Sequence, residues 1–211
     1  MDLVGERWGL LVVRELLLGP KRFTDLRAGL PNASPNVLSE RLRELERGAI
    51  VRRRKLPPPA GSSVYELTDW GRELGPIVLA LGGWAVRSPS FPEDAPVGVD
   101  SAILGMTSLF DPDAAEGFDA TLELGLDDDR FRVRVADGKI EIDRGPVEDP
   151  DAVIETTVET LHEVIWQRLE VAKAVRDGEI RIEGDRRAAS RFVGLFPLPE
   201  QAAPPALAPS G

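Results

Sequence analysis

A dense group of basic residues marks residues 21–60 of the chain. This stretch holds ten Lys and Arg against four Asp and Glu, although the whole chain of 211 residues has a net charge of −10. Arg52, Arg53, Arg54 and Lys55 stand in one run. Cationic side chains at this density bind nucleic-acid phosphates, and each neutralised phosphate releases counterions. The alternative interpretation is a solvated basic face without a partner.

The two halves of the chain differ in the sign of their charge. Residues 1–88 carry 14 Lys and Arg against 10 Asp and Glu, whereas the remainder carries 12 against 26. Such an asymmetry is expected when only one half of a protein meets phosphate. We therefore expect double-stranded DNA to contact the first half.

Other chemistry has few candidate residues. The chain has no cysteine and a single histidine, His162, which excludes thiol catalysis, thiolate metal sites and thiol redox sensing. Two Asp-Pro-Asp segments, at 111–113 and 149–151, could supply paired carboxylates for acid–base catalysis or for a magnesium or calcium ion. Aspartates of this kind more often begin turns. We expect neither an enzyme nor a cofactor nor a metal.

The composition indicates two soluble domains. Hydrophobic residues make up 42% of the chain, and no apolar run is long enough to span a membrane. No secretory signal begins the chain, so we expect a cytoplasmic protein. Proline-rich stretches punctuate it. The predicted parts are a first domain at 1–88, a linker at 89–98, a second domain at 99–197 and a disordered tail at 198–211.

The first domain has the pattern of a helix-turn-helix. An apolar helix ends at Gly19-Pro20, a short helix covers 23–30, a tight turn follows, and a third helix runs over 34–47. Ser34 and Pro35 are the cap and first residue that this third helix requires.

The third helix is amphipathic. Its apolar residues recur at helical spacing and should face the core: Val37, Leu38, Leu42 and Leu45. Its opposite face carries residue types that hydrogen-bond base edges and phosphates: Asn36, Ser39, Arg43 and Arg47.

A β-hairpin and a final helix complete this domain. Residues 50–56 and 63–67 read as two strands joined by a Pro-Pro-Pro-Ala-Gly-Ser turn, and the basic run lies on the first strand. The run suits a hairpin lying along a phosphate backbone. A helix over 70–86 carries an apolar stripe that either belongs to the core or meets a dimer partner: Leu74, Ile77, Val78, Leu81 and Trp84.

These segments resemble the HxlR-type winged-helix regulators, relatives of the MarR proteins. The likeness covers residues 3–87 and rests on "RELLLGPKRF", "SPNVLSERLRELE" and "YELTDWG" in order and spacing. It implies a homodimer on a pseudo-palindromic operator, with helix 34–47 in the major groove and hairpin 52–62 as the wing. The implied DNA-binding residues are Lys21, Arg22, Ser34, Pro35, Asn36, Ser39, Arg43, Arg53, Arg54, Lys55 and Ser62.

The chain departs from the family pattern in two ways. Many members sense oxidants through a cysteine near the N-terminus, and this chain has none. It also begins almost inside the first helix, so either the start is truncated or dimerisation depends more on helix 70–86.

The second domain changes to an alternation of period two. Residues 118–126, 130–135 and 139–143 alternate apolar and polar side chains, and Asp137-Gly138 is a hairpin signal. The pattern predicts an antiparallel sheet with one buried face, covered there by helices. The complete fold is thus α+β, with a winged helix-turn-helix first and an α+β domain second.

Residues 100–197 look like the sterol carrier protein type 2 fold, on the element order and on "DGEIRIEGD" before a final helix ending in "LFP". Relatives enclose an apolar tunnel, so the resemblance implies a small hydrophobic ligand that modulates DNA binding. Candidate lining residues are Met106, Phe110, Leu161, Ile165, Trp166, Phe192 and Phe196. Alternatively these residues are only core, and the domain is a ligand-free dimerisation or interaction module.

Overall fold

A computed structural model of the chain describes residue 5 and residues 8–57, 61–92 and 97–203. Two compact units divide it, Met1–Leu79 and Ala80–Gly211. The division lies inside helix α5 (Gly75–Val86), before the linker expected at 89–98. The tip of the predicted hairpin turn, residues 58–60, and linker residues 93–96 lie outside the described residues.

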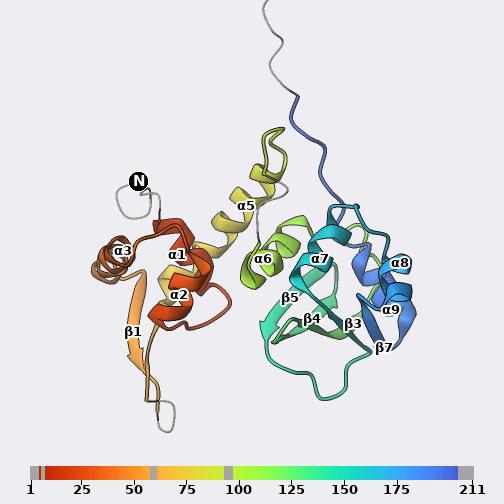
Figure 1. Ribbon diagram of the computed structural model, residues 1–211, viewed down its shortest axis with the longest axis horizontal. Coiled ribbons are helices and arrows are strands. Elements are labelled where there is room, and N and C mark those ends of the chain that lie inside the picture. The colour runs from red at the N-terminus through yellow and green to blue at the C-terminus, as the bar shows by residue number, and fades with distance from the viewer. Residues whose placement is uncertain (1–4, 6–7, 58–60, 93–96, 204–211) are drawn as a thin grey trace, which may run out of the picture. The chain divides into compact units, whose positions relative to one another are not determined.

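The first unit has the predicted winged helix-turn-helix order (Figure 1). Its elements are α1 (Gly9–Leu16), α2 (Phe23–Gly29), α3 (Pro35–Arg47), β1 (Val51–Lys55), β2 (Ser63–Leu67), α4 (Asp69–Arg72) and the start of α5. The β1 and β2 strands pair antiparallel, from Val51 opposite Leu67 to Lys55 opposite Ser63. They form the wing.

The core of this unit confirms three of the four inward residues predicted on α3. Leu38, Leu42 and Leu45 are buried with the apolar residues of α1 and α2. Val37 is a correction, because 36% of it is exposed. It lies one residue before Leu38, about 100° around the helix, and so falls at the edge of the buried stripe.

The predicted helix 70–86 is in fact two helices, α4 and α5. Pro76 is the second residue of α5, and a proline restricts the residue before it and lacks the N–H that would continue an earlier helix. After the break, Leu74 and Val78 pack against the first unit's core, whereas Ile77 and Trp84 are exposed. The predicted stripe therefore separates into a core part and an exposed part.

The second unit is a five-stranded sheet with helices on one face (Figure 1). Its elements are α6 (Val99–Leu109), β3 (Ala120–Leu126), β4 (Asp129–Ala136), β5 (Lys139–Arg144), β6 (Ala152–Thr156), α7 (Val158–Ile165), α8 (Val171–Asp177), β7 (Arg181–Gly184) and α9 (Arg186–Val193). The strand order is β5-β4-β3-β6-β7.

One strand corrects the expectation of a purely antiparallel sheet. Sequence analysis missed β6, which pairs parallel with β3, with Leu124 opposite Ile154. The segment is short, and the Asp-Pro-Asp turn before it masks its alternation. The remaining strand pairs are antiparallel as predicted.

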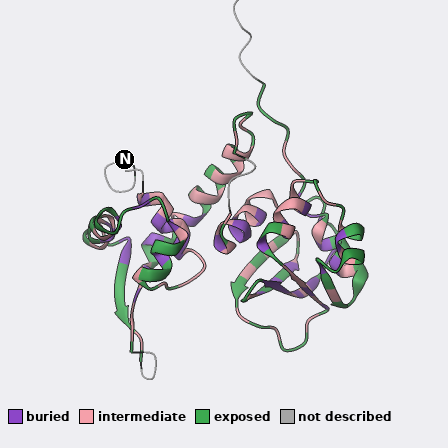
Figure 2. Cartoon of the chain, in the orientation of Figure 1, coloured by how far each residue is buried: buried purple, intermediate pink, exposed green. Residues whose placement is uncertain are grey.

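The alternation of the sheet is confirmed. Leu122, Phe131 and Val133 are buried on the face that the helices cover, and the intervening side chains are partly or fully exposed (Figure 2). Asp127 and Asp137 adopt φ of 52° and 51° in the two hairpin turns, a conformation that Asp tolerates better than most residues.

The start of the predicted tail makes hydrogen bonds within the second unit. The Ala202 N–H donates to the Arg87 carbonyl at 2.7 Å, and Arg87 Nε donates to the Glu200 carbonyl at 3.3 Å. Residues 204–211 lie outside the described residues.

Candidate nucleic-acid interface and apolar cavity

The start of α3 is fixed by the residues that the sequence singled out. The Val37 N–H donates to Ser34 Oγ at 3.3 Å, and Pro35 occupies the first turn. Hydroxyl capping satisfies an otherwise unpaired backbone donor, and proline at this position loses no helical hydrogen bond. The cap holds the front of α3 in one conformation.

The outward face of α3 carries most of the predicted contact residues. Ser34, Pro35, Asn36 and Arg43 are exposed, whereas Ser39 is half-buried. Asn36, Ser39 and Arg43 are spaced by three and four residues, which places them along one side of the helix. The arrangement presents amide, hydroxyl and guanidinium groups, which hydrogen-bond the edges of bases in a major groove.

The wing divides its basic residues between two faces. Arg52 and Arg54 lie on the same side of β1, because strand side chains alternate. Both reach Glu66 of β2: Arg52 Nε donates to Oε1 at 2.7 Å, and Arg54 Nη2 donates to Oε2 at 2.9 Å. Glu66 is buried, at 5% exposure. Its carboxylate therefore neutralises part of this face.

These contacts shift the pKa of Glu66 and of Arg54. The hydrogen bond from Arg54, and then that from Arg52, lower the pKa of Glu66 below its ordinary value although burial opposes the shift. The same hydrogen bond raises the pKa of Arg54. At neutral pH this cluster is one carboxylate between two guanidinium groups.

Arg53 and Lys55 occupy the other face of β1. The Arg53 guanidinium lies over the Tyr65 ring, 5.9 Å from its centroid. Among the described residues neither Arg53 nor Lys55 has a carboxylate within ion-pair distance. Both side chains are exposed. These two cations, unlike Arg54, have no acidic partner within the wing as the structure describes it.

The remaining predicted contacts differ in how accessible they are. Lys21 Nζ lies 2.6 Å from Glu15 Oε2, and its side chain is only 16% exposed. Its backbone exchanges two hydrogen bonds with Tyr65, which attaches this segment to the wing. Arg22 is exposed at the start of α2, and Ser62 is half-buried before β2. Lys21 is therefore poorly accessible, and its contact with DNA stays a prediction.

Sequence reasoning missed the roles of Arg52, Tyr65 and Glu66. The basic run drew attention to charge alone. The signal that could have found them is the hairpin register, which sets Arg52 opposite Glu66 and Arg53 opposite Tyr65. That register depends on the turn, whose length the three prolines leave open.

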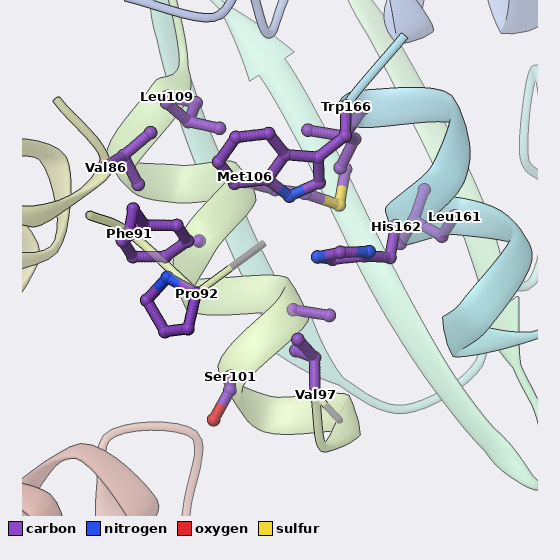
Figure 3. A pocket seen from close by; sticks show the side chains of 13 residues that line it. Val86, Phe91, Pro92, Val97, Ser101, Met106, Leu109, Leu161, His162 and Trp166 are labelled. Atoms are coloured by element: carbon purple, nitrogen blue, oxygen red, sulfur yellow. The ribbon is translucent and has the colours of Figure 1, made fainter. Parts of the chain in front are cut away.

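The second unit contains an apolar cavity of about 170 Å³ (Figure 3). Its lining residues come from the end of α5, from Phe91, Pro92 and Val97, from α6 and from α7. They are Val86, Phe91, Pro92, Val97, Ser101, Ala102, Gly105, Met106, Leu109, Leu161, His162, Ile165 and Trp166.

Four of the seven predicted lining residues are in this wall: Met106, Leu161, Ile165 and Trp166. The other three, Phe110, Phe192 and Phe196, instead pack on one another. Their ring centroids are 6.3 Å apart for Phe110 and Phe196 and 5.1 Å apart for Phe192 and Phe196. Phe192 and Phe196 are buried, so these aromatic residues are core.

Aromatic rings form one side of the cavity. Phe91 stacks on Trp166 at 5.4 Å between centroids, and His162 lies 5.8 Å from the same Trp166. In Figure 3 the His162 imidazole points toward the middle of the lining side chains, whereas the Ser101 hydroxyl points away. Sequence analysis missed Phe91 because it lies in a proline-rich stretch without periodicity.

The described residues form neither a cluster of metal ligands nor a membrane-spanning helix. Over the described ranges of the chain, no three or more His, Asp or Glu side chains gather as metal ligands would. None of the helices described is both long enough and apolar enough to cross a lipid bilayer.

Comparison with known proteins decides the class of the first unit. The model of the HxlR-like helix-turn-helix family matches residues 3–90. YvaP, an uncharacterised HTH-type transcriptional regulator of Bacillus subtilis, is 43% identical over 93 residues, which cover 43% of this chain and 86% of YvaP. The chain belongs to the HxlR family. It is a helix-turn-helix transcription regulator, as predicted.

Other HxlR-type regulators extend the comparison. YodB of Bacillus subtilis is 39% identical over 84 residues, covering 40% of this chain and 75% of YodB. The reduced form of YodB has a solved structure that covers 45% of this chain and 90% of its own, with a TM-score of 0.38 and 36% identity.

The second unit matches a different model. Residues 106–202 match the alkyl sulfatase C-terminal family. The inverting sec-alkylsulfatase Pisa1 of Pseudomonas sp. is 22% identical, with a TM-score of 0.45, over 48% of this chain and 16% of Pisa1. The predicted likeness to sterol carrier protein type 2 is not confirmed by this match and stays a prediction.

Proposed function

We propose that this HxlR-type regulator binds an operator as a homodimer, with α3 in the major groove and the β1–β2 wing on the phosphate backbone. The capped, outward face of α3 supports this, since Asn36 and Arg43 are exposed on it. An exposed guanidinium pairs bidentately with guanine, and an amide with adenine. A bacterial regulator of this kind acts in the cytoplasm.

Within the wing, Arg53 and Lys55 are the proposed phosphate ligands. They are exposed and have no carboxylate partner among the described residues, whereas Glu66 holds Arg52 and Arg54. A guanidinium that already shares a buried carboxylate gains less from a phosphate, because its charge is partly neutralised. This division is the observation that carries the proposed contact.

The second copy of the chain covers the exposed apolar residues of α4 and α5 in this proposal. Trp70, Ile77, Leu81 and Trp84 are 51%, 53%, 45% and 72% exposed. Large apolar side chains grouped on neighbouring turns mark interaction surfaces. Replacing Leu81 and Trp84 by Glu is expected to yield monomers in analytical ultracentrifugation, and a variant that stays dimeric would contradict this assignment.

The second unit supplies a regulatory input in this proposal, through a small hydrophobic ligand. The apolar cavity of about 170 Å³ supports this role. Such a ligand can shift DNA binding only if it binds the DNA-binding conformation of the protein and the conformation that does not bind DNA with different affinities. The other candidate is a ligand-free interaction module. Deleting the unit would then weaken self-association, and added small molecules would change nothing.

We infer no catalysis by this chain. The relatives of its first unit are named as transcriptional regulators. An enzymatic role for the second unit stays as the alternative, because residues 106–202 match an alkyl sulfatase segment. Its candidate residues, His162 and the Asp-Pro-Asp aspartates, are distributed differently: His162 lies in the cavity wall, whereas Asp111 accepts from the Asp113 N–H in a turn.

DNA binding is tested by fluorescence anisotropy of the full chain on a fragment of its own promoter, with a scrambled fragment as the competitor. The proposal expects preferential binding that weakens steeply as salt rises. Equal affinity for both fragments, with no salt dependence, would contradict it.

A further inference from the structure

The cavity of the second unit has the dimensions of a site for one small ring. Its volume is about 170 Å³. An engineered protein cavity of about 150 Å³ lined by Leu, Ile and Phe takes up benzene. A long alkyl chain would fill this cavity with only part of its length and leave the rest outside it. The size of the cavity therefore favours single-ring ligands over the lipids that the sterol carrier resemblance implies.

The wall of the cavity favours an aromatic occupant. Phe91 and Trp166 contribute rings to it, and the thioether of Met106 lies there as well (Figure 3). Aromatic rings attract one another through their quadrupoles, and methionine sulfur adds favourable contacts with ring edges. An aliphatic ligand of equal volume would gain the apolar burial without these contacts.

Polar groups are few in this wall, and they include the His162 imidazole and the Trp166 indole N–H. The His162 imidazole points toward the middle of the lining residues from α7 (Figure 3). An imidazole has two nitrogen atoms that hydrogen-bond, so one can serve a ligand while the other keeps a partner within the chain. Apolar sites fix the orientation of a ligand through a few such polar groups.

From these observations we infer that the cavity binds a small aromatic molecule of one ring that carries one hydroxyl or similar polar substituent, with the substituent on His162. The inference rests on the proposed ligand-responsive role of the second unit and names the ligand class. Phe91 and Pro92 bring the predicted linker into the wall.

The structure offers a variant that fills the cavity. Gly105 lies on α6 in the wall, and a Cβ added there would meet no atom within 4 Å. Gly105→Leu therefore places a side chain into open space, in a helix that a leucine favours over a glycine. Gly98 has equally open surroundings but is not a lining residue, so Gly98→Leu is the matched control.

The test titrates the full chain with phenol, toluene and decanoate by ligand-observed NMR. We expect phenol and toluene to bind and decanoate to bind at least about tenfold more weakly. Gly105→Leu should lower the affinity for both aromatics about tenfold or more, and Gly98→Leu should leave them within about twofold. His162→Phe should lower the phenol affinity about five- to tenfold and spare toluene, since one hydrogen bond is lost.

Several results would overturn the inference. Tighter binding of decanoate than of toluene would assign the cavity to alkyl chains, and equal effects of Gly105→Leu and Gly98→Leu would place the aromatics elsewhere. A second measurement guards against misfolding of Gly105→Leu: toluene must shift the indole N–H resonance of Trp166 in the unmodified chain. Absence of that shift contradicts the inference. DNA binding, measured separately, shows whether the proposed regulator function fails instead.

Discussion

Arginine-rich strands occur in both units, but their surroundings differ. On β4 the register sets Arg132 between Glu123 of β3 and Asp143 of β5, and Arg134 opposite Glu141, although among the described residues none of these pairs lies within ion-pair distance. The wing strand β1 has a single neighbour, β2, which supplies one carboxylate, Glu66. A central strand exposes its cations to acids on both sides, whereas a hairpin strand leaves one side open to a ligand.

The comparison teaches that arginine content alone does not indicate a nucleic-acid site. The decisive feature is whether the neighbouring strands already supply the negative charge. Cross-strand opposite charges stabilise a sheet modestly, and they also reduce what a phosphate can add. On this criterion we propose that Arg53 and Lys55 of β1 bind DNA and that Arg132 and Arg134 of β4 do not.

Removing Arg53 and Lys55 together should lower DNA affinity more than any other variant proposed here. Arg53→Ala with Lys55→Ala is expected to weaken DNA binding about 10- to 100-fold at physiological salt, on specific and scrambled sequences alike, because phosphate contacts carry no sequence information. Anisotropy titrations on both fragments measure this. A loss confined to the specific fragment would show that the wing reads bases instead.

Arg43→Ala should change sequence preference rather than general affinity. A guanidinium that pairs with one base contributes about 1–3 kcal/mol of discrimination at that position. Competition among single-base variants of the operator measures the change. If the variant loses affinity equally for every fragment, Arg43 contacts the backbone and the orientation proposed for α3 is wrong.

Glu66 should make the wing sensitive to acid. Its pKa is lowered in the folded state, so its stabilising effect is present above its ordinary pKa of 4.5 and is lost as the pH falls through the lowered value. Glu66→Gln should lower the free energy of unfolding by about 1 kcal/mol at neutral pH, since its arginines are partly exposed to solvent. Urea unfolding at about pH 7 and about pH 3 should show a smaller difference at the lower pH; equal differences at both would contradict the ion pairing.

The smallest effect is expected on β4. Arg132→Ala with Arg134→Ala removes two positive charges, as the wing variant does, yet should change DNA affinity less than about twofold, because the acids opposite them on β3 and β5 offset their charge. Gel-shift titrations on the same fragment compare the two. A loss as large as that of the wing variant would remove the distinction between the strands.

Much of this fold follows from local sequence signals. The cap at Ser34, the stop at Gly19-Pro20 and the turn at Asp137-Gly138 each constrain a few neighbouring residues, and the structure has them as predicted. The break before Pro76 and the parallel strand β6 were missed. A parallel pair joins segments distant in sequence, so no local spacing indicates it.

The candidate sites were predictable to different degrees. Charge and periodicity located α3 and the wing. Which of Arg53 and Arg54 is left without a carboxylate partner depends on which of them meets Glu66 across the hairpin. The cavity depends on volume left unfilled among α6, α7 and Phe91. Apolar spacing is the same for a filled core and for a cavity wall, which explains why Phe192 and Met106 looked alike.

The most direct test is the salt dependence of DNA binding in the two double variants side by side. The logarithm of affinity against the logarithm of salt concentration falls with a slope of about −0.9 for each phosphate neutralised. Arg53→Ala with Lys55→Ala should make this slope less negative by about 1.8, the amount expected when about two phosphate contacts are lost. Arg132→Ala with Arg134→Ala should leave the slope of the unmodified chain. Parallel slopes for the wing variant and the unmodified chain would contradict the proposal that the open face of β1 binds the DNA backbone.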